Sequence, residues 1–344
     1  MTGKEIILKA LRFEETPRLP VGVLDGYAWI LNQTGKSFQD LFDDEGGAAI
    51  AARHYRLLQS DIAYANAHVY NVIYRVMGGE IDFSRVGDAA EIKRPPFTAI
   101  TDYKKFSVDQ VMETAFEEPE YKAVICQSCE LVAILGEEKL VSSLSFAPFT
   151  IAGMLVGVQE FMACMYEDED GEIANLIDFA ADIVIKISEK FIECGAEAVF
   201  IADPVASGDL ISPDVYETYA LPAVKKVCAA FNQRNIPVFC HICGHTEKRL
   251  EPLVGSGLAA FSMDTVDLDT ALSTARGHYA IMGNLSPFEV ILSKSVDEVR
   301  IIGNARAKTA GRSGGFIMMP GCDLPPKAPL ANILAMVAAA HNAQ

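Results

Sequence analysis

The stretch PVFCHICGHT, residues 237–246, decides the fold class of this chain. Its apolar part is short, it stops at Gly244, and a segment with helical spacing of apolar residues follows. This order predicts a buried strand over Pro237–Ile242, followed by a turn and a helix. Apolar runs with similar surroundings recur at Leu140–Phe146, Ala198–Ile201, Ala259–Met263, Tyr279–Met282 and Gly315–Met319.

The repeated order of strand and helix predicts an α/β fold. Weaker strand signals at Leu19–Val23 and Asp61–Ala67 bring the number of β–α units to seven or eight. This number favours closure into a barrel, so we expect a single (β/α)8 TIM barrel with N-terminal additions. Ile81–Phe83 and Ala90–Lys93 are expected to form a hairpin on the barrel. Because no linker or repeat divides the chain, we expect one domain over residues 1–344.

The charge of the chain limits its partners. The 344 residues include 29 Lys and Arg against 46 Asp and Glu, a formal net charge of −17. No basic cluster offsets this charge, so nucleic acid and anionic membranes are expected to be poor partners. The sequence shows no secretory signal and no run of about 18 uncharged apolar residues, the length of a membrane span. We therefore expect a soluble, cytoplasmic protein whose eight cysteines are reduced.

The end of the strand at 237–242 predicts a metal site. Side chains alternate along a strand, so His241 and Cys243 point to the same side. Cys322 follows another predicted strand, 79 residues later, and the C-terminal ends of barrel strands open onto one mouth. One imidazole and two thiolates suit Zn²⁺, and three protein ligands leave the open position of a catalytic zinc. His245 is an alternative or fourth ligand, with less weight because Gly244 is expected to break the strand.

These residues also have a plainer interpretation. An H-x-C spacing arises by chance, and a buried cysteine is commonly just a small hydrophobic residue. Cys126 and Cys129 form a C-x₂-C pair on the predicted helix Tyr121–Leu135, where we expect them to face the core. The glycines at 311, 314 and 315 precede a strand instead of following one, which argues against a phosphate-binding loop.

Further motifs lie at the ends of the predicted strands. They are Ala147–Thr150, Val156–Val158, Ala202–Pro213, His241–Gly244, Ser262–Asp264, Met282–Asn284 and Pro320–Pro326. With these motifs the chain resembles the uroporphyrinogen decarboxylase superfamily over nearly its whole length. It is most similar to the branch of cobamide-dependent methyltransferases, because the H-x-C motif together with Gly-Cys-Asp at 321–323 is specific to that branch.

The resemblance implies an activity. Zinc would be held by His241, Cys243 and Cys322. A methyl group would move from a methylated corrinoid (methylcobamide), presented by a separate corrinoid protein, to a zinc-activated thiol such as coenzyme M. The protein would thus be a methylcobamide-dependent, zinc-containing methyltransferase.

Other residues at the strand ends are expected to serve the same centre. Asp203 and Asp264 would be catalytic, orienting His241 or positioning substrate, although a solvated loop carboxylate is the plainer interpretation of each. Thr150, Ser207 and Asn284 are expected to bind the corrinoid cofactor, and for Asn284 the alternative is turn chemistry.

Several other functions stay open. Porphyrinogen decarboxylases hold their polycarboxylate substrate with arginines in an N-terminal stretch, and the corresponding Trp29–Lys36 contains none, which disfavours decarboxylation. The methyl group could also travel from a small methylated substrate onto Co(I), or be passed to tetrahydrofolate. A non-enzymatic zinc scaffold for a corrinoid protein is the last alternative.

Overall fold

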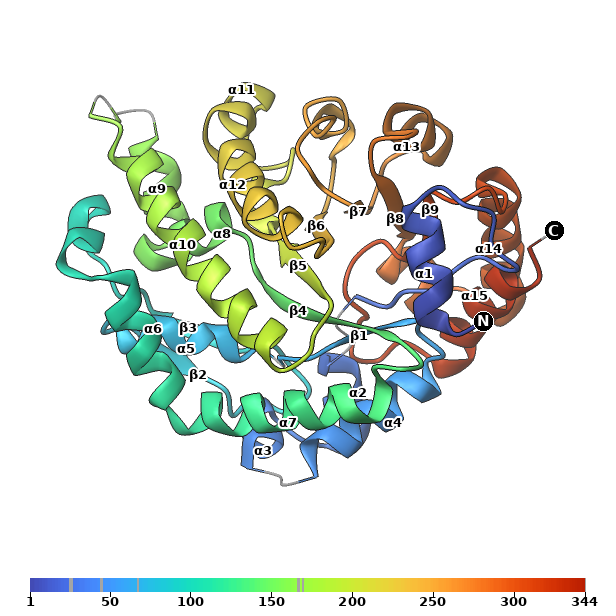
Figure 1. Cartoon of the computed structure of the whole chain (residues 1–344), viewed down its shortest axis with the longest axis horizontal. Coiled ribbons are helices and arrows are strands. Elements are labelled where there is room, and N and C mark those ends of the chain that lie inside the picture. Colours follow the sequence, from blue (N-terminus) through green and yellow to red (C-terminus); the bar gives the residue numbers. More distant parts are fainter. Residues whose placement is uncertain (25–26, 44–45, 67, 166–167, 169, 344) are drawn as a thin grey trace.

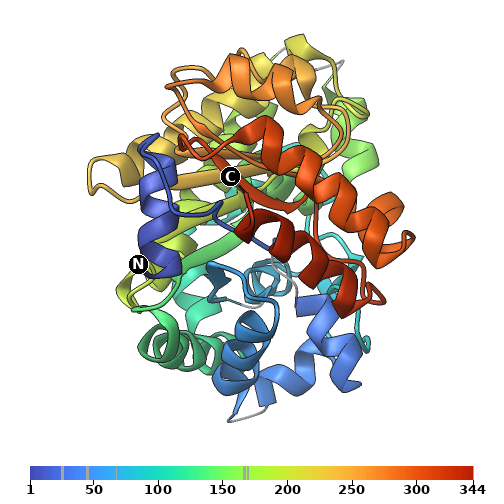
Figure 2. The same cartoon turned by 90° about the vertical axis from the view of Figure 1, so that its right-hand side faces the viewer.

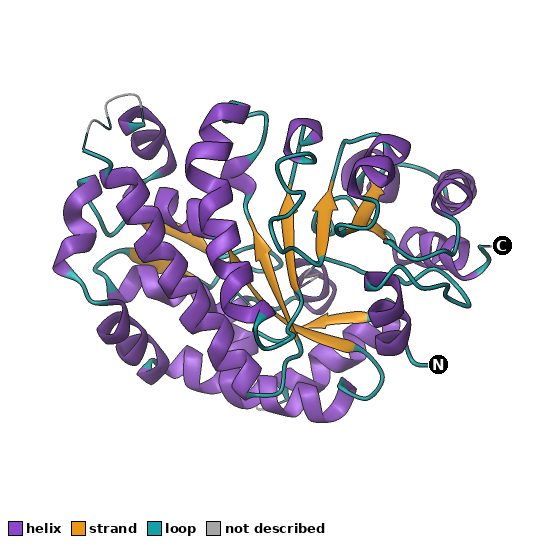
Figure 3. Cartoon of the chain, turned by 45° about the horizontal axis from the view of Figure 1, so that its top comes forward, coloured by secondary structure: helices purple, strands orange, loops and turns teal. Residues whose placement is uncertain are grey.

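A parallel sheet forms the centre of the computed structural model, which describes residues 1–24, 27–43, 46–66, 68–165, 168 and 170–343. Neighbouring strands pair in the order β1-β4-β5-β6-β7-β8-β9, and every pairing is parallel. The strands are β1 (Ile62–Tyr64), β4 (Leu140–Phe146), β5 (Ala198–Ala202), β6 (Val238–Ile242), β7 (Ala260–Met263), β8 (Ala280–Leu285) and β9 (Phe316–Pro320). The sheet curls, and helices cover its outer face (Figures 1 and 3).

The expected α/β fold is confirmed, with one correction to the strand count. In the described residues, the sheet has seven hydrogen-bonded strands, not eight. The predicted strand Leu19–Val23 instead makes a single parallel bridge, between Val21 and Met318 of β9. On its other side, the backbone N–H of Asp61, just before β1, donates to the Val21 carbonyl over 2.7 Å. The segment therefore fills the gap between the two edge strands.

Two features explain why this segment forms no longer ladder. Pro20 has no N–H to donate, and the Val21 N–H is taken by the carboxylate of Asp61 at 2.9 Å. The same carboxylate receives two 2.7 Å hydrogen bonds from the guanidinium of Arg18. A side chain thus replaces part of the backbone pairing that an eighth strand would make.

The α-helices follow the strands as the periodicity predicts. They are α1 (Gly3–Leu11), α2 (Tyr27–Thr34), α3 (Phe38–Asp43), α4 (Gly47–Leu57), α5 (Val72–Val76), α6 (Val108–Glu117), α7 (Pro119–Leu135), α8 (Pro148–Val156), α9 (Val158–Cys164), α10 (Glu172–Glu193), α11 (Pro213–Val215), α12 (Leu221–Asn232), α13 (Leu268–Ala275), α14 (Val296–Ala310) and α15 (Leu330–His341). From opposite ends of the chain, α1 and α15 both pack against β9 (Figure 2).

Short helical turns and one hairpin complete the chain. The turns are η1 (Val69–Asn71), η2 (Ile100–Lys105), η3 (Pro204–Ala206), η4 (Tyr216–Ala220), η5 (Glu247–Arg249) and η6 (Pro287–Leu292). The predicted hairpin is present as the antiparallel strands β2 (Glu80–Asp82) and β3 (Glu91–Arg94). The last residue of the predicted strand Asp61–Ala67 lies outside the described residues. In the described part of the chain, no helix is long and apolar enough to cross a membrane.

The structure corrects a second expectation, which concerns the two cysteines of α7. Cys126 and Cys129 are exposed, although the C-x₂-C pair was predicted to face the core. The buried face of α7 is formed by other positions, among them Val124, Ser128 and Leu131. Helical spacing puts the two thiols outside this stripe. They are therefore available to solvent.

Candidate functional site

The imidazole of His241 is the best-positioned metal donor at the barrel mouth. His241 lies near the C-terminal end of β6 and is buried. The register places it opposite Ser262 on β7, whose Oγ lies 3.0 Å from the His241 Nδ1. Among the described residues, nothing hydrogen bonds to the buried Nε2 of His241. This nitrogen is thus available to bind a ligand when the ring carries its proton on Nδ1.

Two thiols meet beside this imidazole. Cys243 follows β6 and Cys322 follows β9, so strands that are distant in sequence bring them together. Cys322, and after it His241, interact with the sulfur of Cys243 and lower the pKa of Cys243, against the raising effect of burial. The interaction with Cys243, and then burial, raise the pKa of Cys322. The two sulfurs are therefore neighbours at the barrel mouth.

The donor set fits zinc in chemistry, although the side chains are not gathered as a finished ligand shell. Within the described ranges, no group of three or more His, Cys, Asp and Glu side chains is arranged to hold a metal ion as it stands. Cys243 nevertheless contacts both other predicted ligands, and Nε2 of His241 is buried and unpaired. One imidazole nitrogen and two thiolate sulfurs form a donor set that Zn²⁺ prefers.

Asp203 is buried next to this cluster, so the solvated-loop interpretation is wrong for it. It follows β5, and its N–H donates to the carbonyl of His241 at 2.8 Å. Its Oδ1 accepts hydrogen bonds from the N–H and the hydroxyl of Thr150, at 3.0 and 2.6 Å. Burial raises the pKa of Asp203 to about 7, against the lowering effect of Thr150. Its Oδ2 is buried and, in the described part of the chain, unpaired.

Asp264 connects the two loops that carry the thiols. It follows β7 and is half-buried, which raises its pKa, and the backbone N–H of Gly244 donates to its carboxylate. A Cβ on Gly321 would lie 2.6 Å from the Asp264 Oδ1 and 2.9 Å from its Cα. Only glycine fits there without displacement. The loop that carries Cys322 is therefore packed directly against Asp264.

The three residues expected to bind cofactor lie in the first turn of α8 (Thr150), just after η3 (Ser207) and near the end of β8 (Asn284). The hydroxyl of Thr150 is occupied, since it donates to Asp203 and accepts from the N–H of Val205 at 3.2 Å. Ser207 is buried, and its Oγ lies 3.2 Å from an oxygen of Asp209. Asn284, after a cis peptide bond, donates its Nδ2 to the Val266 carbonyl at 2.6 Å. Its Oδ1 is buried without a partner among the described residues.

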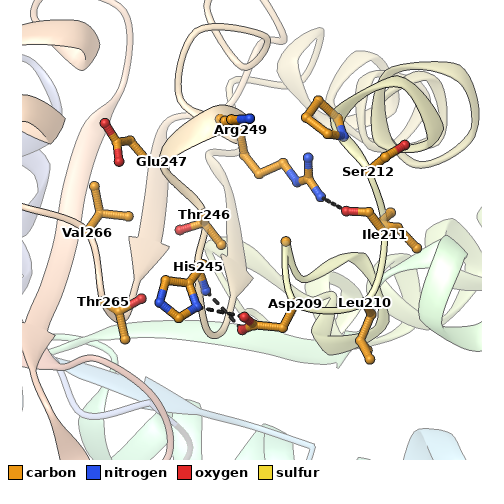
Figure 4. Close-up of a pocket in the computed structure, with 13 residues that line it drawn as sticks. Asp209, Leu210, Ile211, Ser212, His245, Thr246, Glu247, Arg249, Thr265 and Val266 are labelled. Atoms are coloured by element: carbon orange, nitrogen blue, oxygen red, sulfur yellow. Dashed lines mark hydrogen bonds and ion pairs between the residues drawn. The ribbon is translucent and has the colours of Figure 1, made fainter.

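A pocket of about 500 Å³ opens beside these loops (Figure 4). The loops after β5, β6 and β7 line it. At one edge of it, the Nδ1 of His245 lies 2.6 Å from the Oδ1 of Asp209, and the His245 N–H donates to the same carboxylate. His245, the alternative zinc ligand, thus has one ring nitrogen engaged, and 78% of its side chain is exposed.

Arg249 fixes the shape of this pocket. It is buried, its Nη2 donates to the Ile211 carbonyl over 2.7 Å, and its guanidinium lies 4.7 Å from the centre of the Tyr216 ring. These contacts hold the β5 loop against the β6 loop. Neither the role of Arg249 in this pocket nor the contact of Ser262 with His241 was predicted from the sequence. The signal for Ser262 was the register of β6 on β7, which one sequence does not reveal.

A curled parallel α/β sheet with polar residues gathered at its C-terminal edge defines a class of barrel enzymes. The family model that matches residues 2–343 is described as "Uroporphyrinogen decarboxylase (URO-D)". The chain belongs to this family.

Curated relatives divide between two activities. A methylcobamide:CoM methyltransferase (MtbA) of Methanosarcina mazei is 33% identical over 60% of this chain and 59% of its own length. Another (MtaA), from Methanosarcina barkeri, is 26% identical over 98% of this chain and 97% of its length. A uroporphyrinogen decarboxylase of Carboxydothermus hydrogenoformans is 24% identical over 98% of this chain and 96% of its length. The relatives are thus methyltransferases or decarboxylases.

Solved structures support the fold. A methyltransferase from Methanosarcina mazei superposes with a TM-score of 0.86 over 98% of both chains, at 22% identity. A B12-independent methionine synthase from Shewanella reaches a TM-score of 0.60 over 95% of this chain and 97% of that chain, at 11% identity. At these identities the likeness concerns the fold alone.

Proposed function

We propose that the protein is a zinc-dependent methyltransferase that moves a methyl group from a methylated corrinoid to a thiol such as coenzyme M. The observation that carries the proposal is the meeting of Cys243 with both Cys322 and His241, whose Nε2 is buried and unpaired within the described chain. The similarity to methylcobamide:CoM methyltransferases over nearly the full chain also supports it.

The three side chains would hold zinc, which when bound keeps the acceptor sulfur as a thiolate at neutral pH. That thiolate would attack the methyl group of the methylcorrinoid. A carbon–sulfur bond forms as the carbon–cobalt bond breaks, and the electron pair of that bond stays on cobalt, which becomes Co(I). The products are a thioether and the Co(I) corrinoid.

Neighbouring residues would position the ligands. Ser262 contacts Nδ1 of His241 and so would fix the orientation of the ring whose Nε2 binds the metal. Asp203, held by Thr150, supports the backbone of His241 from the next strand. Asp264 joins the β6 and β9 loops and thereby sets the separation of Cys243 from Cys322. Removing residues that hydrogen bond to metal ligands commonly lowers metal affinity by about 10–100-fold.

The pocket beside the mouth gives the acceptor a place to bind. Its volume of about 500 Å³ is within the range of small-molecule sites. Lys248 and Arg249 contribute cationic groups to its lining. The corrinoid would be presented by a separate corrinoid protein at the open, C-terminal end of the strands.

Decarboxylation of a porphyrinogen is less well supported. The stretch Trp29–Lys36 has no arginine with which to clamp carboxylates. Its polar groups are partly used inside the protein, since Trp29 Nε1 donates to the Ala328 carbonyl at 2.7 Å and Gln33 Nε2 to the Pro326 carbonyl at 3.3 Å. These contacts attach the segment to the chain that follows β9, and the segment has no cationic side chain other than Lys36 for a polycarboxylate.

A methylcobalamin assay tests the proposal. The zinc-loaded protein should consume methylcobalamin only when a thiol is added, and coenzyme M and other small thiols should be compared. If the protein reacts only with a methylated small molecule and Co(I), methyl transfer in the opposite direction is supported instead. A parallel assay tests tetrahydrofolate as the methyl acceptor. Release of CO₂ from uroporphyrinogen would reject the proposal in favour of decarboxylation.

A further inference from the structure

Two cysteines meet on the outside of the barrel, away from the mouth. Cys129 lies on α7, and Cys194 is the residue that ends α10. The C-terminal end of α10 lies against α7 (Figure 1). Because α10 leads into the first residue of β5, this contact is at the N-terminal end of the strands. It is thus at the opposite end from Cys243 and Cys322.

The backbone of α7 brings the two sulfurs together. The thiol of Cys194 donates to the carbonyl of Ile125 at 3.7 Å. In an α-helix, the carbonyl of residue 125 also accepts from the N–H of residue 129. Helical side chains lean toward the helix N-terminus, so the Cys129 sulfur is inclined toward the turn on which Cys194 rests. The two thiols are close enough to interact, and this interaction contributes to the raised pKa of Cys194.

Close packing next to the pair holds it in place. A Cβ on Gly195, which follows Cys194 with φ +100°, would come within 2.9 Å of the Cγ1 of Val132 on α7. Val132 is one turn after Cys129, on the same side of the helix. The end of α10 therefore touches α7 on both sides of the thiol pair.

A third cysteine provides a control. Cys126 is exposed like Cys129 and lies one turn before it on α7. Its sulfur lies 3.7 Å from the Oε1 of Glu130, so its recorded hydrogen bond is with a carboxylate of its own helix. Both Cys126 and Cys129 are therefore accessible to reagents, but of these two it is Cys129 that contacts Cys194.

We propose that Cys129 and Cys194 form a reversible disulfide when the protein meets a hydroperoxide. The exposed Cys129 sulfur attacks a peroxide oxygen, the O–O bond breaks, and water leaves from hydrogen peroxide. The resulting sulfenic acid is attacked by the sulfur of Cys194, and a second water leaves. Two thiols and one hydrogen peroxide thus give one disulfide and two waters. A dithiol reverses the reaction by two exchange steps.

The surroundings assign the two roles. Cys129 is exposed, whereas Cys194 is partly buried. Burial, and then the hydrogen bond to Cys129, raise the pKa of Cys194, so this thiol keeps its proton until its partner is oxidised. Cys129 is then the attacking residue and Cys194 the resolving one. This assignment does not depend on the proposed methyl transfer.

The experiment uses the full-length reduced protein and hydrogen peroxide. After a brief exposure, free thiols are blocked, and the protein is analysed by intact mass and by non-reducing peptide mapping. We expect a cross-link between the peptides that contain residues 129 and 194, and its removal by dithiothreitol. Because the disulfide closes a loop of about 65 residues, the melting temperature should rise by roughly 3–8 °C.

Variants decide the outcome. Cys129→Ser and Cys194→Ser should each lose the cross-link and the gain in melting temperature, and Cys126→Ser should keep both. Three results would overturn the proposal: a link between 126 and 129, sulfinic acid at Cys129 without a link, or a link to 194 that survives in Cys129→Ser. Methyl transfer is measured separately. The cross-link is read by mass, so it can be detected whether or not the protein transfers a methyl group.

Discussion

Ser262 on β7 lies directly beside His241 on β6, with 3.0 Å between the serine Oγ and the imidazole Nδ1. This contact orients the ring, so that Nε2 is the nitrogen left for a ligand. A parallel register between two adjacent strands therefore defines the direction of the proposed metal donor.

The first prediction concerns this contact. Ser262→Ala removes the hydroxyl beside Nδ1 and leaves the ring free to rotate, so zinc affinity should fall by about 10–100-fold. Competition with a chromophoric chelator measures the change. Ser273→Ala, at an exposed position of α13, is the matched control and should bind zinc like the wild type. Equal affinity in both variants would contradict the orienting role of Ser262.

The second prediction concerns the thiol ligands. Cys243→Ser and Cys322→Ser should each lose bound zinc and reduce methyl transfer by more than about 100-fold, because each removes a sulfur donor. Circular dichroism should remain that of the wild type, since both residues lie beyond strand ends. Elemental analysis and the methylcobalamin assay provide the measurements. Cys126→Ser should retain metal and activity, and normal turnover in either ligand variant would reject the site.

The third prediction concerns the buried carboxylate of Asp203. Thr150→Val keeps the size of the side chain but removes the hydroxyl that donates to Oδ1 over 2.6 Å. The lost hydrogen bond to a buried group should lower the free energy of unfolding by about 1–3 kcal/mol. Urea unfolding at a fixed neutral pH measures it. Thr114→Val, on the exposed side of α6, provides the comparison and should change stability little.

The fourth prediction concerns pH and stability. Glu120 on α7 accepts two hydrogen bonds from Arg75, at 2.9 and 2.7 Å, and this pairing lowers the pKa of Glu120 from its ordinary value of 4.5. Its stabilising effect is therefore complete above pH 4.5 and is lost as the pH falls through the lowered pKa. Glu120→Gln should cost about 1 kcal/mol at pH 7, because Arg75 is partly exposed to solvent.

The pH series distinguishes this pair from an exposed one. The difference between wild type and Glu120→Gln, measured by urea unfolding, should shrink as the pH drops below 4.5. Glu117→Gln breaks a pair with Lys122 in which both side chains are largely exposed, and it should have little effect at any pH. A constant difference for Glu120→Gln down to pH 3 would show that its charge is not the cause.

Local patterns were sufficient to place most strands and the candidate ligands. Short apolar runs that end at glycine or a polar residue mark strand ends, and alternation puts His241 and Cys243 on one side. The sequence also predicted that Cys322 lies near Cys243, because the parallel strands of a curled sheet all end at one edge. These inferences need only the period of a strand and the order of the elements.

Relations across the sheet were beyond the reach of one sequence. The burial of Asp203 depends on Thr150 from another strand end, and the single bridge of Val21 depends on the carboxylate of Asp61. The exposure of Cys129 depends on how α7 is rotated against α10. Each of these is set by tertiary packing, which overrides local propensity.

The closing segment around Val21 also bears on how the chain is made. Its neighbours are Asp61 on one side and, on the other, Met318, which is 297 residues from Val21 in the sequence. During synthesis the segment around Val21 can pair with Asp61 soon after both have emerged, but Met318 emerges only after many more residues have been made. The pairing of Val21 with β9, which closes the sheet, therefore forms late. Until then, the backbone of Val21 on that side is unpaired and can bind other chains.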